Sequence, residues 1–83
     1  MKIVAAAILY DGVVHTHPPP ARHADIIRAI WKQVGKRVVC ETQGFVTDEG
    51  KFVDRIEAGK IALAAGQLKE LAVPPDLYSE DLW

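Results

Sequence analysis

Residues 43–67 read QGFVTDEGKFVDRIEAGKIALAAGQ, a stretch that decides the fold because it encodes a β-hairpin followed directly by a capped helix. Its first half has the apolar and β-branched segments Phe45-Val46-Thr47 and Lys51-Phe52-Val53 on either side of Asp48-Glu49-Gly50. This pattern predicts two short strands joined by a three-residue loop, with Gly50 in the left-handed position of that loop.

The second half of the stretch predicts a helix with a marked beginning and end. Asp54 is the expected N-cap, and Glu57 three residues later is its capping partner. Gly66 is the expected terminating residue. The buried stripe of this helix is expected to consist mainly of small side chains, namely Ala58, Ile61, Ala62 and Ala65.

A second hairpin is predicted at the N-terminus. Residues 3–10 read IVAAAILY, Asp11-Gly12 is a strong hairpin-turn signal, and Val13 to Thr16 form the expected return strand. The apolar run is far shorter than the about 20 residues of a membrane span, and no small-residue cleavage site follows it. We therefore expect a buried strand, with neither a signal peptide nor a membrane association. The three prolines that follow His17 lack N–H donors and predict a loop.

Between the two hairpins the apolar residues change to a helical period. A helix is predicted over residues 22–34, ending at Gly35. A further strand is predicted over residues 37–41. The expected buried face of the helix comprises Ile26, Ile27, Ile30, Trp31 and Val34.

These elements predict a small α+β domain over residues 1–72, with an extended C-terminal tail over residues 73–83 that packs on the domain or on a partner. The sheet is antiparallel, built from two hairpins plus a strand, with two helices on one face. The other face would stay open unless a second subunit covers it, so we expect a homo-oligomer. The chain has 83 residues with 49% hydrophobic and 25% charged, a composition typical of a globular domain.

Three histidines, His15, His17 and His23, lie within nine positions and are a candidate zinc site, with Cys40 or Glu41 as a fourth ligand. The alternative is that they are unrelated residues of a solvated loop, and we expect no cofactor. Cys40 is the single cysteine, which excludes a disulfide within the chain and suits a reducing cytoplasm.

Covalent catalysis and nucleic-acid binding find little support. Cys40 lies in an apolar run, typical of an inert buried thiol, and Ser79, the single serine, lies in the tail. We therefore expect no catalytic residues. The net charge is -1, and no aromatic platform accompanies the basic residues near the first helix, so we interpret these as a solvated face and expect no nucleic-acid partner. Those basic residues are Arg28, Lys32, Lys36 and Arg37.

An anion site is the stronger candidate. Arg22 and His23 lie at the start of the first predicted helix, and Arg55 lies at the start of the second. Helix N-termini attract anions, and an arginine beside one can bind phosphate with two hydrogen bonds. The alternative is that Arg55 pairs with a local acid, Glu49 or Asp54.

The quoted stretch and the closing residues LYSEDLW together resemble a family of small proteins of tailed phages and prophages. That family has the pattern QGF-x-T-x-x-G-[RK]-F-V-x-R-x-E-A-x-x-I-A-x-x-A-G-Q, then L-x-S-E-D-L-[WY]. The chain departs from it at Thr42, where the family usually has Glu, and at Ile56, which replaces a common acid. The resemblance implies a phage accessory protein that acts on the host, in the cytoplasm of the infected bacterium.

Three functional hypotheses follow from the resemblance and the residues. The first is a non-enzymatic, anti-defence protein that sequesters a nucleotide-like or otherwise phosphorylated molecule between subunits. Phe45 would be its stacking surface, and its polar contacts would be Arg22, His23, Gln43, Arg55 and Gln67. The second is an inhibitor that contacts a host protein directly through the apolar, acidic tail. The third is a small metal-dependent enzyme based on the three histidines.

Overall fold

The structure is a computed structural model that describes residues 1–35 and 42–83. The strand predicted over residues 37–41 therefore lies outside the described residues. Among the helices described, none is long and apolar enough to cross a membrane. The elements are, in chain order, β1 (Ile3–Tyr10), β2 (Val13–Thr16), α1 (His23–Val34), β3 (Thr42–Thr47), β4 (Phe52–Asp54), α2 (Arg55–Ala64) and α3 (Ser79–Leu82).

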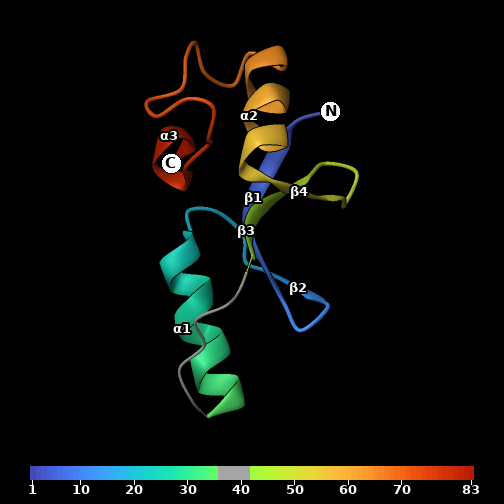
Figure 1. Cartoon of the computed structure of the whole chain (residues 1–83), viewed down its shortest axis with the longest axis vertical. Coiled ribbons are helices and arrows are strands. Elements are labelled where there is room, and N and C mark those ends of the chain that lie inside the picture. Colours follow the sequence, from blue (N-terminus) through green and yellow to red (C-terminus); the bar gives the residue numbers. More distant parts are fainter. Residues whose placement is uncertain (36–41) are drawn as a thin grey trace.

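The four strands form one antiparallel sheet in the order β2-β1-β3-β4 (Figure 1). Both predicted hairpins are confirmed. β1 turns into β2 at Asp11 and Gly12, whose φ angles of 52° and 76° give the tight turn that matches the twist of the strands. β3 turns into β4 through a loop in which Gly50 has a φ of 80° and donates its N–H to the oxygen of Thr47 at 2.9 Å.

One face of the sheet forms the hydrophobic core. Ala6 is the register partner of Phe45, and Phe45 is the partner of Val53, so their side chains share a face with Ile8. Both long helices cover this face, as predicted, so the α+β class is confirmed. The residues that complete the core from outside the sheet are Ile26, Ile30, Ala58, Ala62 and Leu77.

Helix α1 begins one residue later than predicted and ends as predicted before Gly35, which has a φ of 79°. Its buried stripe is shifted toward the N-terminus. His23, three residues before Ile26, is buried, whereas the last helical residue, Val34, is exposed. The prediction that Val34 is buried was therefore wrong, because the stripe that contacts the sheet begins at a histidine that hydrophobicity alone does not select.

Helix α2 confirms the predicted cap. The Asp54 carboxylate accepts the Glu57 N–H at 2.8 Å. Ala58 and Ala62 are buried as expected, but Ala65 is exposed because the helix ends at Ala64 and Ala65 is its C-cap. Gly59 is also buried, and a Cβ at this position would lie 3.1 Å from the main-chain oxygen of Pro75. The small side chains therefore let the C-terminal segment cross the helix closely.

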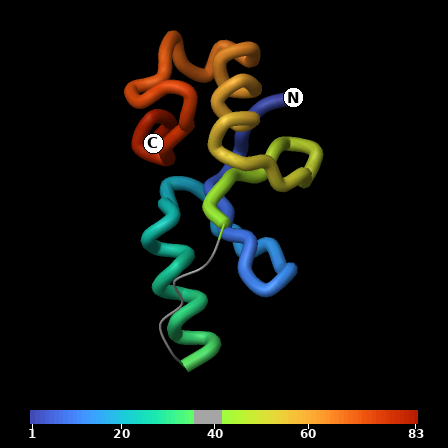
Figure 2. Tube along the Cα trace, in the orientation of Figure 1, coloured from blue at the N-terminus to red at the C-terminus, as the bar shows by residue number. Residues whose placement is uncertain are grey.

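The C-terminal segment was predicted to be extended. In the structure it folds back and includes the short helix α3. Figure 2 shows it running beside α2 before it reaches the region where α1 begins. Leu77 is 0% exposed and belongs to the core, and Ser79 is buried as well. The segment thus packs on its own domain.

Candidate functional site

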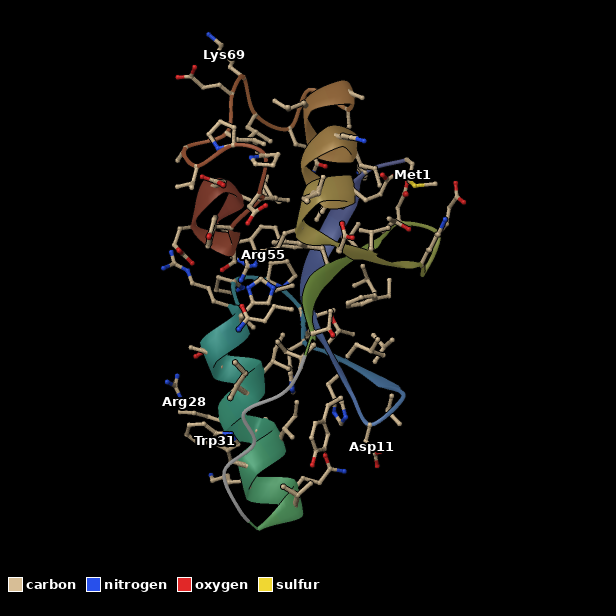
Figure 3. All side chains as sticks on the ribbon, viewed as in Figure 1. Met1, Asp11, Arg28, Trp31, Arg55 and Lys69 are labelled. Carbon is tan, nitrogen blue, oxygen red and sulfur yellow. The ribbon has the colours of Figure 1, made fainter. Side chains whose placement is uncertain are left out.

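Four segments that are far apart in the sequence meet around Arg55. They are the start of α1, strand β3, the start of α2 and the C-terminal segment. Figure 3 shows the Arg55 side chain lying between the C-terminal segment and the upper end of α1. We call Arg22, His23, Gln43, Arg55 and Glu80 the arginine cluster.

Arg55 is held by three contacts. Its guanidinium donates to the main-chain oxygen of Leu77 at 2.7 Å and to the side-chain oxygen of Gln43. The guanidinium also lies over the Tyr78 ring, 4.4 Å from its centroid, which is a cation–π geometry. The guanidinium of Arg55 therefore contacts β3 and the C-terminal segment rather than Glu49 or Asp54. Asp54 caps α2 instead.

Arg22 connects the beginning of α1 to the end of the chain. Its guanidinium donates to the main-chain oxygen of Trp83 at 2.8 Å. In return, the Trp83 indole N–H donates to the main-chain oxygen of Ala21 at 3.0 Å. The Arg22 N–H donates to the Asp25 carboxylate at 2.9 Å, which fixes the first turn of the helix. The positive charge of Arg22 is thereby placed at the N-terminus of α1.

His23 is 6% exposed and lies against β3. Its Nε2 is 2.7 Å from the oxygen of Gly44, and because a carbonyl only accepts, Nε2 is the donor. The ring meets Phe45 edge to face with centroids 5.0 Å apart. Burial lowers the pKa of His23, and the charge of Arg55 lowers it further, against the opposing effects of the Gly44 hydrogen bond and of Glu80. We therefore expect a neutral imidazole at pH 7.

Glu80 is the acidic side chain of the cluster, and the charges of both arginines act on it. The pKa of Glu80 is lowered, first by the hydrogen bond that the Ser79 hydroxyl donates at 2.8 Å and also by the charges of Arg22 and Arg55. The Glu80 side chain is on the exposed side of the cluster, whereas Ser79 is buried. The cluster thus attracts negative charge and carries an acidic side chain of its own.

The structure brings together four of the six residues predicted to contact a ligand: Arg22, His23, Gln43 and Arg55. Phe45 is next to them but is 0% exposed, so its ring offers no free stacking surface. Gln67 lies elsewhere. Its amide accepts the Ile3 N–H at 2.7 Å and donates to the Ile3 oxygen at 2.8 Å, beside the irregularity in β1.

Sequence reasoning missed the part that the C-terminal segment has in the cluster. Leu77, Tyr78 and Glu80 all contact or face the arginines, yet they are more than twenty residues from Arg55 in the sequence. The available signal was the segment LYSEDLW itself, which was expected to pack on the domain or on a partner but was not connected with the arginines.

The three histidines do not form a metal site in the structure. His15 lies beside Tyr10 on the first hairpin, with ring centroids 6.3 Å apart, while the Nε2 of His23 is committed to Gly44. Within residues 1–35 and 42–83, no group of three His, Cys, Asp or Glu is placed to hold a metal ion. Cys40 and Glu41, the candidate fourth ligands, lie outside the described residues, as do Lys36 and Arg37 of the proposed basic face.

Comparison with known proteins gives one result. The family model described as Phage T4 y16D protein matches residues 2–83, which is nearly the whole chain. No curated protein and no solved structure matches this chain. The match agrees with the resemblance to small phage proteins that residues 43–67 and the closing LYSEDLW suggested. The chain therefore belongs to the phage T4 y16D protein family.

Proposed function

We propose that this chain is a phage accessory protein that binds a phosphorylated, nucleotide-like molecule at the arginine cluster. The observation that supports the proposal is that Arg22 and Arg55 both reach the C-terminal segment, where their guanidinium groups donate to the main-chain oxygens of Trp83 and Leu77. Two arginines from the starts of two different helices therefore meet at one segment, and their charges help to lower the pKa of Glu80 there. A phosphate at that position would meet guanidinium groups able to form paired, charge-assisted hydrogen bonds.

Other groups around the cluster suit such a ligand. The Gln43 side chain already accepts from Arg55, and its amide N–H₂ is a donor. Tyr78 and Trp83 are half-buried aromatic residues beside the two arginines, so they replace Phe45 as the surface for a base. In this proposal the negative charge of Glu80 opposes the approach of an anionic ligand to the arginines.

The hypothesis of a host-protein inhibitor that docks through its tail receives less support from the geometry. The tail would first have to remove Leu77 from the core and release the hydrogen bonds of Trp83 to Ala21 and Arg22. Full burial of a leucine contributes about 1.5–3 kcal/mol, so this release opposes docking. The arginine cluster needs no such rearrangement of the core, because Glu80 lies on its exposed side.

Isothermal titration calorimetry tests the proposal with inorganic phosphate, cyclic nucleotides and ADP-ribose-type nucleotides. Glu80→Gln removes a negative charge near the arginines, and interactions between exposed charges are worth about 0.2–1 kcal/mol, so binding of an anion should tighten by about 1.4-fold to 5-fold. Arg22→Gln should weaken binding by about tenfold or more, because it removes a charged hydrogen-bond donor. Arg28→Gln is the matched control, since Arg28 is an exposed arginine of the same helix whose partner is Asp25.

The outcomes separate a binding site from a structural contact. Tighter binding by Glu80→Gln together with weaker binding by Arg22→Gln, and no change in Arg28→Gln, would support the site. If no member of the panel binds either the wild type or Glu80→Gln, the proposal is overturned. The arginines would then serve only to hold the C-terminal segment on the domain.

A further inference from the structure

The two edges of the sheet differ in how they are protected. β4, at one edge, has three residues, follows Lys51 and continues directly into α2. β2, at the other edge, has neither a charged residue nor a proline between Val13 and Thr16. Its valines are 55% and 41% exposed. Charges, prolines, short strands and covering helices are the usual means by which an edge avoids pairing. β2 is also short, but it has no charge or proline of its own, and no other strand of the described residues pairs with its outer side.

The turn at Asp11-Gly12 determines which main-chain groups of β2 face away from β1. A two-residue turn makes its flanking residues, Tyr10 and Val13, a hydrogen-bonded pair. Because hydrogen-bonded and non-hydrogen-bonded pairs alternate along an antiparallel ladder, Val14 and Thr16 belong to the other type. Their N–H and C=O groups therefore point away from β1 and can be satisfied by another strand.

We infer that β2 pairs in an antiparallel manner with β2 of a second copy of this chain, about a two-fold axis that passes beside His15. The two outward residues, Val14 and Thr16, are placed symmetrically about His15. In this register Val14 lies opposite Thr16 of the partner subunit. The outward N–H and C=O groups of these residues then form four main-chain hydrogen bonds between the two copies, all within the strands. A one-residue shift of the axis would bring either Gly12 of the turn or Pro18, which has no N–H, into the pairing.

Side chains and charges also fit a second copy. Pairs of β-branched residues such as valine and threonine stabilise neighbouring strands. The partner subunit's Val14 would lie beside Thr16, at the rim of a cavity of about 350 Å³ on the open face of the sheet. From residue 11 to residue 21 the one formally charged side chain is Asp11, which this register places opposite a proline, so no like charges meet. The lining of the cavity includes Val4, Ala5, Thr16, Pro18, Pro19 and Val46.

The interface is short, so we expect a reversible dimer whose population rises with concentration. Sedimentation velocity of the full chain over a wide concentration range measures it directly. This register predicts how charged substitutions at His15 affect dimerisation, because His15 lies opposite His15 of the partner subunit. His15→Lys or His15→Glu alone would then bring like charges together and give monomers, whereas an equal mixture of the two variants would restore the dimer.

Val73→Lys and Val73→Glu are the matched controls, because they change the charge equally at an exposed residue in the C-terminal segment. Both should form dimers like the wild type, and circular dichroism should show all variants folded. A wild type that stays monomeric at every concentration would overturn the inference, even if it captured a strand of another protein. Dimers of His15→Lys alone, or a mixture that stays monomeric, would overturn the pairing as well.

Discussion

At the residue scale, the imidazole of His23 connects the first helix to the sheet. It is buried between α1 and β3, donates to the Gly44 carbonyl, and lies edge-on against Phe45. A protonated ring would have to be desolvated beside the positive charge of Arg55, and for this reason the pKa of His23 is lowered. We therefore expect the packing of α1 to depend on pH.

We expect the free energy of unfolding to fall on acidification below pH 6.5. The unfolded chain, with an ordinary histidine pKa near 6.5, takes up the proton before the folded chain does. The contribution of His23 is fully present above that pH and is lost as the pH falls toward the lowered folded pKa. The slope in this window approaches about 1.4 kcal/mol per pH unit.

Urea unfolding at a series of pH values measures this dependence. His23→Gln keeps an amide donor and removes the titration, so its curve should be flat in the same window. His17→Gln is the control, because His17 is exposed in the proline loop. A His23→Gln curve as steep as that of the wild type would contradict the assignment. The lowered pKa of Glu80 acts in a separate window, below 4.5.

At the scale of elements, α2 begins without any connecting loop after β4. Strand β4 ends at Asp54, the same residue that caps the helix, so one side chain marks the change from strand to helix. This abrupt change places Arg55 in the first turn of α2, where its guanidinium reaches both β3 and the C-terminal segment. The cap therefore contributes to the position of the arginine cluster as well as to the stability of the helix.

Asp54→Ala should lower the free energy of unfolding by about 1 kcal/mol, the usual cost of removing a side-chain N-cap. Asp54→Ser retains an oxygen that can accept the Glu57 N–H and should stay close to the wild type. Chemical denaturation of the three proteins checks this. Equal losses in both variants would show that the carboxylate charge, rather than the cap, is what matters.

At the scale of the whole molecule, the C-terminal segment closes the fold. It crosses α2 at Gly59, places Leu77 in the core, and ends against the start of α1 through Arg22 and Trp83. The N-terminal strand is held by a residue that follows α2, because the Gln67 side chain hydrogen-bonds both the N–H and the C=O of Ile3. Segments near both ends therefore contact the same domain, and we expect them to unfold together with it.

Leu77→Ala should accordingly cost about 2–5 kcal/mol, as for any fully buried leucine of a core. Leu63→Ala is the control, since Leu63 is an exposed leucine on α2. Equilibrium unfolding in urea gives both values. If Leu77→Ala cost no more than Leu63→Ala, the segment would be a peripheral attachment rather than part of the core.

The sequence by itself determined the elements whose signals are local. The turn at Asp11-Gly12, the loop at Gly50, the Asp54 cap and the end of α1 at Gly35 each depend on a few adjacent residues, and all four are confirmed. The class of fold follows from their order, because two hairpins and two helices, each with one buried stripe, can cover their apolar faces in few ways.

The tertiary structure alone decided how the candidate site is built. Helical periodicity could not show that His23 begins the buried stripe of α1, or that Phe45 is covered by it. Nor could local signals place Leu77, Tyr78 and Glu80 around Arg55. These contacts join segments separated by more than twenty residues, and their partners are chosen by burial and by hydrogen-bonding needs that exist only once the chain has folded.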